Sequence, residues 1–192
     1  DAELNAKIYR NSTILFNENT NNNPWNIKFG STFNMASDSQ LFETYESLIN
    51  KGAKLKGNIF QFEARNYVPL YEGKMFWIYN HHYGSWPTNG ERPNSIDCPE
   101  ITNMQNSHYN IMPWYWVPEE LVIENYKKRN SQGKEIWAWN HKWILAFRKL
   151  TNATNERTLV ISAMPGTFGA GDSTTLLCVE RGTIPGVLLQ AI

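Results

Sequence analysis

The side chains best suited to recognition gather in one short stretch near the middle of the chain. This stretch follows an apolar run with a glycine and a lysine, and it combines imidazole, phenol, amide and indole groups. Such rings stack on planar ligands, and their nitrogen and oxygen atoms form hydrogen bonds. The candidate binding residues here are Lys74, Asn80, His81, His82, Tyr83 and Trp86.

A second stretch, residues 143–158, brings basic and amide side chains to a predicted turn after a strand-like run. Lysine and arginine contact phosphates, an arginine also forks onto guanine, and an asparagine amide pairs with adenine. Tyr83 and Trp86 would support a base or a sugar. These residue types therefore suit contact with DNA, and the candidates in this half of the chain are Lys142, Arg148, Lys149, Asn155 and Arg157.

The remaining reactive side chains predict neither a metal site nor a nucleophile. Adjacent histidines on a strand point to opposite faces, so His81 and His82 rarely bind one ion, even with His141 as a third ligand. His108 and Cys98 could complete such a site, but structural histidines are the simpler interpretation. The two cysteines are too few for a disulfide framework, and we expect free thiols in a reducing, cytoplasmic compartment.

Motifs for nucleotide binding and for nuclease chemistry are weak or absent. Residues 166–171 are glycine-rich, but they follow Pro165 and no helical pattern comes after them, so a phosphate loop is not indicated. Pro118 and Glu119 lack the partner acid and lysine of a metal-dependent nuclease. We therefore expect no catalytic residue and no cofactor in this chain.

Charge and length limit the class of protein. The formal net charge is zero and the pI about 7.1, whereas free-standing DNA-binding proteins are usually basic. Residues 124–157, however, include eight basic residues and only three acidic ones. A local basic face on a neutral chain suits a module whose partner domains supply further phosphate contacts. The 192 residues suit one domain, 1–192, excised from a longer protein, with an irregular segment 1–34. No membrane span or signal peptide is predicted.

Periodicity predicts an α+β fold with a mixed or antiparallel sheet. A helix is expected over 37–50, with Ser37 and Gln40 as a capping box and Gly52 as its stop. A second helix is expected from Pro118 to about residue 130. Pro69 suggests an edge strand or a bulge. Residues 84–113 form a long loop without periodicity and 166–171 a flexible one; the expected strands are 59–63, 67–71, 74–79, 114–117, 136–150, 158–164 and 174–180.

The central stretch, Val68-Pro69-Leu70-Tyr71-Glu72-Gly73-Lys74-Met75, is the best-marked part of a family resemblance. The chain resembles the target-recognition region of large type IIG-like restriction-modification enzymes, the adenine-N6 DNA methyltransferases. The resemblance spans about residues 24 to 180, in order. The other stretches that carry it are 25–29, 35–42, 79–82 and 147–158, with Pro165 after the following strand.

The resemblance implies a non-catalytic domain that holds double-stranded DNA while a methyltransferase domain of the same chain flips an adenine. The S-adenosylmethionine implied for the whole protein would bind outside this chain, which lacks the N-P-P-Y-like motif. Whether a nuclease also belongs to that protein is open. Two departures matter, because the family's acidic residue is Asn80 here and its arginine is His82.

Two other classes stay open, a carbohydrate-binding module and a metal-dependent nuclease domain. Secretion signals and disulfides would favour the first, and acids clustered around a metal the second. Within the DNA-binding hypothesis, residues that read bases should differ between relatives that read different sequences. The shared motif residues Lys74, Asn155 and Arg157 therefore suit phosphate contacts or a structural role, and loop 84–113 suits base readout.

Overall fold

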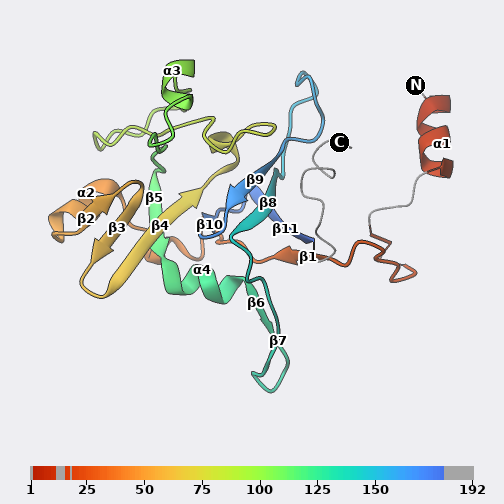
Figure 1. Ribbon diagram of the computed structural model, residues 1–192, viewed down its shortest axis with the longest axis horizontal. Helices are drawn as coiled ribbons and strands as arrows, with labels where there is room; N and C mark the ends of the chain where they lie inside the picture. Colours follow the sequence, from red (N-terminus) through yellow and green to blue (C-terminus); the bar gives the residue numbers. More distant parts are fainter. Residues whose placement is uncertain (1, 12–15, 18, 180–192) are drawn as a thin grey trace.

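The protein has the predicted α+β fold, with two mainly antiparallel sheets, a separate hairpin and short helices (Figure 1). The computed structural model describes residues 2–11, 16–17 and 19–179. Within these residues no helix is long and apolar enough to cross a membrane.

The first sheet has the order β1-β11-β8-β9, and every strand pair in it is antiparallel. Leu145 and Leu177 face each other in register and pack into a small cluster on one side of this sheet. Ile144 and Leu176 point to the other side and join the main core, so both faces are covered. The strands are β1 (Ile27–Gly30), β8 (Trp143–Arg148), β9 (Ile161–Pro165) and β11 (Thr174–Val179).

The second sheet is organised around its longest strand, β4 (Arg65–Tyr71). On one edge β4 pairs with β3 and, further along, with β10 in parallel; on the other edge it pairs with β5. The predicted strands 59–63, 67–71 and 114–117 are thereby confirmed with small shifts at their ends. The partners of β4 are β3 (Ile59–Phe62), followed outward by β2 (Lys54–Lys56), β5 (Tyr115–Pro118) and β10 (Gly169–Ala170).

Pro69 lies in the middle of this paired strand, so the predicted edge position is wrong. Its partner in register on β5 is Trp116, whose backbone N–H and C=O bond to Glu43 on the far side instead. Pro69 therefore sits in a non-hydrogen-bonded pair, where a missing N–H costs nothing. On the opposite edge of β4, Pro69 lies between the residues that pair with β3 and those that pair with β10.

The predicted helix over 37–50 is divided into η1 (Ser39–Leu41) and α2 (Tyr45–Asn50). Glu43 between them has extended backbone, because its N–H and C=O pair with Trp116. The helix cap is consequently Thr44, whose hydroxyl accepts the N–H of Ser47 at 3.2 Å, and not Ser37. Gly52 ends the segment as predicted, with a positive φ of 82°.

The second predicted helix begins where expected but is shorter, because α4 (Glu119–Asn125) ends before a hairpin. Lys127 to Arg129 form β6, which pairs with β7 (Glu135–Ala138). The single strand predicted over 136–150 is therefore two strands, β7 and β8, separated by a turn. Strand 158–164 begins later, at Ile161, and of strand 174–180 only residue 180 lies outside the described residues.

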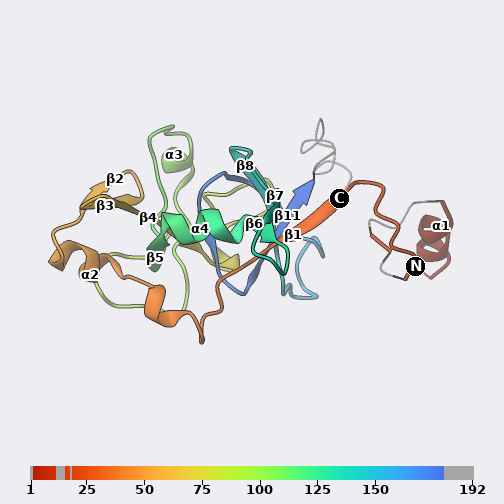
Figure 2. The same cartoon turned by 90° about the horizontal axis from the view of Figure 1, so that it is seen from below.

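Two segments expected to be irregular are ordered. Residues 2–11 form a helix, α1 (Ala2–Asn11), which lies apart from both sheets and buries none of its residues (Figure 2). Residues 166–171 contain β10 rather than a flexible loop. At Gly166 a side chain has no room, since a Cβ there would lie 2.5 Å from the carbonyl carbon of Lys142.

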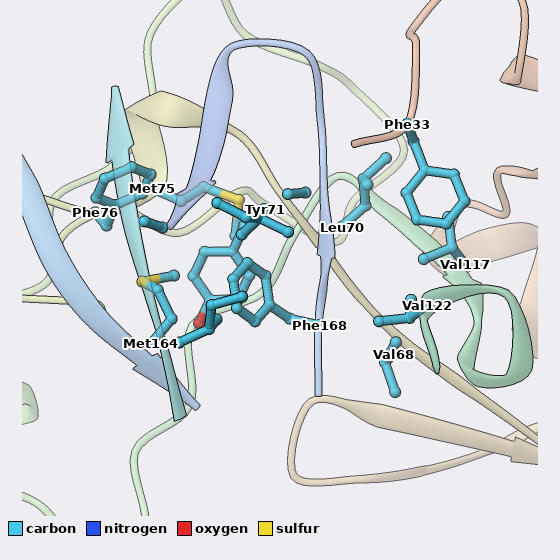
Figure 3. Close-up of a cluster of buried hydrophobic side chains, with 14 of the residues drawn as sticks. Phe33, Val68, Leu70, Tyr71, Met75, Phe76, Val117, Val122, Met164 and Phe168 are labelled. Carbon is cyan, nitrogen blue, oxygen red and sulfur yellow. The ribbon is translucent and has the colours of Figure 1, made fainter. Parts of the chain in front are cut away.

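The main core fills the space between the two sheets and is lined from both (Figure 3). Tyr71 from β4 meets Phe168 edge-on at 5.1 Å between ring centroids. Burial of the Tyr71 phenol raises its pKa, so this ring stays neutral. Met75 and Phe76 are fully buried in the same core and fix the start of the segment described next.

Candidate nucleic-acid interface

Residues 76–83, the central turn, form a tight turn where a strand over 74–79 is predicted. Gly73 to Met75 form a short 3-10 helix, η2 (Gly73–Met75), so the chain leaves the sheet after Tyr71. The N–H of Trp77 donates to the carbonyl of Asn80 at 2.7 Å, and the N–H of Asn80 donates back at 3.1 Å. The strand prediction is therefore wrong, because these backbone groups are satisfied within a turn.

Arg148 joins the end of β8 to this turn. Its Nε and Nη2 donate to the carbonyl of Phe76 at 3.2 and 2.6 Å, and its guanidinium lies 4.5 Å from the ring centre of Trp77. Tyr83 stacks on Trp77, with 5.2 Å between the two ring centres. Desolvation lowers the pKa of Arg148, which nonetheless stays a cation. Arg148 thus positions the turn through Nε and Nη2.

The two histidines of the turn lie side by side, with ring centres 4.1 Å apart. Burial, together with the neighbouring His82, lowers the pKa of His81 to about 4, and burial also lowers the pKa of His82. Both rings are therefore neutral at pH 7. Asn80 accepts the backbone N–H of His82 at 2.8 Å and approaches Met104 with its amide, which draws the turn against helix α3 (Ile101–Met104).

Residues 84–113, the long loop, are anchored at both ends and carry α3 between them. Trp86 is only 2 % exposed, and its backbone N–H donates to the carbonyl of Met112 at 2.8 Å. A base or sugar cannot stack on so buried a ring, so that expectation for Trp86 is wrong. Arg92 lies 4.6 Å from the ring centre of Trp86 and donates from Nη2 to both carboxylate oxygens of Glu72 at 2.7 Å.

Lys74 is exposed beside Trp86. Its Nζ lies 5.7 Å from the ring centre of Trp86 and 3.5 Å from the carbonyl of Asn94. Its charge therefore stays at the surface near the central turn. Tyr83, on the other side, forms a hydrogen bond with Cys98 of the long loop, which raises the pKa of the phenol. Tyr83 thus ties the end of the central turn to the long loop.

Residues 149–160, the hairpin loop between β8 and β9, carry Asn155 and Arg157. Arg157 is exposed and Asn155 is half-buried, and the N–H of Asn155 donates to the carbonyl of Asn152 at 3.0 Å. The hairpin loop and α3 both lie at the upper edge in Figure 1, and Figure 2 shows them apart across the depth of the molecule. The central turn contacts Met104 of α3, and the N–H of Tyr79 donates to the carbonyl of Ile161, the first residue of β9 after the hairpin loop.

Lys142 lies away from this edge, because it precedes β8 whereas Arg148 ends it. It lines a separate cleft of about 230 Å³ with Lys127, Trp139 and His141. The predicted basic face is also divided. Glu124 pairs with Lys127 at 2.8 Å and with Arg129 at 2.9 Å, and the β6–β7 hairpin projects from the lower edge in Figure 1.

The potential metal ligands and the glycine-rich segment 166–171 are the remaining groups of chemical interest in the sequence. No group of three or more His, Cys, Asp or Glu in that part of the chain is arranged to hold an ion. Other side chains of the protein fill the space beside Gly169 in this segment, since a Cβ there would lie 2.6 Å from a methyl group of Val117. The glycine-rich segment therefore serves packing between the sheets.

The structure brings together five of the candidate residues, namely Asn80, His81, His82, Tyr83 and Arg148, and leaves Lys74 and the hairpin-loop pair at the border. The sequence interpretation missed Arg92 and Glu72, which lie 20 positions apart. It also passed over Tyr79, although this residue lies within the ring-rich stretch. Its backbone conformation, with a positive φ, is what distinguishes Tyr79 from the other tyrosines described.

Comparisons of the chain with family models, with curated proteins and with solved structures find no significant match. The membership in the type IIG-like family therefore stays a prediction from the motifs.

Proposed function

We propose that this chain is a non-catalytic target-recognition domain that binds double-stranded DNA for a neighbouring adenine-N6 methyltransferase domain. The observation that carries the proposal is the edge formed by the central turn between the long loop and the hairpin loop. Two projecting loops with a hydrogen-bonded turn between them suit a grooved polymer. The long loop carries basic, amide and ring side chains, the central turn carries amide and ring side chains, and the hairpin loop carries basic and amide side chains.

The roles divide by charge and by sequence pattern. Lys74 and Arg157 are exposed at the two borders of the edge, and as cations they suit phosphate contacts. Asn80 and the neutral imidazoles of the turn suit hydrogen bonds that carry no net charge. The exposed side chains of α3, among them Asn103, suit contacts to base edges. Lys142 is left out of this surface.

In this proposal the methyl donor is S-adenosylmethionine, held entirely by the neighbouring domain, and the chain contributes binding and orientation. The proposed enzyme is thus a restriction-modification methyltransferase whose specificity comes from this domain. No step of methyl transfer is assigned to residues of this chain.

The carbohydrate alternative loses support from the burial of the tryptophans. Carbohydrate-binding modules stack sugars on exposed aromatic rings, yet none of the eight tryptophans is exposed. The tryptophans are instead buried or half-buried, and seven of the eight pack into the apolar clusters of the protein. Nothing in the described residues favours the nuclease alternative.

Fluorescence anisotropy with a labelled 20-bp duplex at increasing salt tests the proposal. If about three to five phosphates are contacted, log K falls against log salt with a slope of roughly −3 to −4.5. A labelled oligosaccharide serves as the comparison ligand. Absence of duplex binding at low salt would reject the proposal, and tight oligosaccharide binding would replace it with the carbohydrate alternative.

A further inference from the structure

Tyr79 stands at the apex of the central turn in an unusual backbone conformation. Its φ is +58°, in the left-handed region that bulky residues seldom adopt. The turn enforces it, because the N–H of Tyr79 donates to the carbonyl of Ile161 at 3.1 Å while Trp77 and Asn80 close the turn. Strained residues held this firmly concentrate at ligand-binding sites. The ring is also 58 % exposed, so the strain does not serve to bury it.

Two large apolar side chains are exposed on the elements that flank this turn. Ile101, at the start of α3, is 73 % exposed, and Leu150, at the start of the hairpin loop, is 83 % exposed. Both elements are tied to the turn, by the contact of Asn80 with Met104 and by the bonds of Arg148 to Phe76. An edge that would contact DNA thus carries a tyrosine and two aliphatic groups exposed to water.

We propose that Tyr79 inserts between adjacent base pairs of bound duplex DNA and locally unstacks them, with Ile101 and Leu150 against the widened groove. This inference rests on the proposed function. Apolar and aromatic wedges of this kind part a base step and bend the duplex, and the exposed base then gains a new stacking partner. A rigid turn suits the task, because a ring on a mobile loop would fold away before it parted the bases.

The assay follows the twist of a closed circular plasmid, and it requires no knowledge of the recognised sequence. Parting two base pairs lowers the local twist, so a plasmid relaxed by topoisomerase I in the presence of the chain retains a changed linking number. Four proteins are compared, the wild type, Tyr79→Phe, Tyr79→Asn and Tyr9→Asn. Asparagine tolerates a positive φ, so it removes the ring and keeps the turn. Tyr9 on α1 is 75 % exposed and serves as the matched surface control.

The wild type, Tyr79→Phe and Tyr9→Asn are expected to shift the linking number to the same extent. Tyr79→Asn is expected to lose the shift while a gel-shift assay on the same plasmid shows affinity within about tenfold of the wild type. The inference is overturned, with the proposed function intact, if the wild type binds the plasmid without a shift or if Tyr79→Asn shifts it equally. Failure of the wild type to bind the plasmid at low salt rejects the function and the inference together, and points to a protein partner for the exposed edge.

Discussion

Arg148 donates two hydrogen bonds to the carbonyl oxygen of Phe76, at 3.2 and 2.6 Å. Phe76 is fully buried, and Arg148 ends a strand of the first sheet. A residue that resembles a DNA contact in the sequence therefore fastens the central turn to β8.

Replacement of Arg148 by alanine is expected to lower the free energy of unfolding by about 1–3 kcal/mol, because the buried carbonyl of Phe76 loses both donors. Arg148→Lys should recover part of this loss, since an ammonium group donates but cannot fork. Urea denaturation measures the effect. The control is Lys149→Ala, the loss of an adjacent exposed charge, which should change stability by less than about 0.5 kcal/mol. Equal effects of the two alanine variants would show that charge, and not the hydrogen bonds, matters here.

The burial of His81 predicts a pH dependence of stability. Its pKa in the folded protein, about 4, lies below the ordinary value of 6.5, so the unfolded chain binds a proton that the folded protein resists. The contribution is fully present above pH 6.5 and is lost as the pH falls from 6.5 towards 4. Denaturation at intervals across this range should show a shallower decline for His81→Gln than for the wild type. His108→Gln, at an exposed position in the long loop, is the control and should follow the wild type.

His82 offers a test of charge at the centre of the candidate surface. Burial lowers its pKa, so it adds no positive charge at pH 7. We expect His82→Arg to raise the affinity for duplexes of every sequence and to steepen the salt dependence by about one phosphate contact. Anisotropy titrations at two salt concentrations measure both. A gain for one sequence alone would mean that this position reads bases.

The sequence predicted correctly those elements that are marked by alternating apolar residues or by a proline or glycine at their ends. Strands β3 and β5, the Pro118 start of α4 and the Gly52 stop belong to this group. Helix 37–50 failed because Glu43 pairs with Trp116, a partner 73 positions away by their residue numbers. No local pattern contains such a contact.

Contacts between residues far apart in the sequence also explain which site residues were predicted wrongly. The ring-rich stretch was recognisable from its composition, but the inward orientation of Arg148 depends on Phe76, 72 positions away. Lys142 and Arg148 lie close together in the sequence. Lys142 precedes the six-residue strand β8 and Arg148 is its last residue, so the two side chains lie at opposite ends of this strand. The burial of Trp86 follows from the return of the long loop at Met112, which its composition did not reveal.

The long loop gives a prediction about specificity. Because Trp86 and Ile111 are buried anchors and Arg92 pairs with Glu72, only residues 93–110 should be exchanged between relatives. In a protein that joins this domain to its methyltransferase domain, that exchange is expected to change the methylated sequence. Mapping of methylation sites on a random library measures it. Exchange of residues 130–134, at the tip of the β6–β7 hairpin, should leave the site unchanged; the reverse result would assign readout to the hairpin.

The most direct test of the candidate surface compares two exposed cations at opposite edges of the molecule, Arg157 in the hairpin loop and Lys128 in β6. Each is replaced by alanine, and duplex binding is measured from low to moderate salt. If DNA lies along the central turn, Arg157→Ala weakens binding to all sequences alike and reduces the salt slope by about 1, while Lys128→Ala leaves both unchanged. A loss of affinity and slope in Lys128→Ala, with Arg157→Ala unaffected, would contradict the account and place the DNA on the opposite edge.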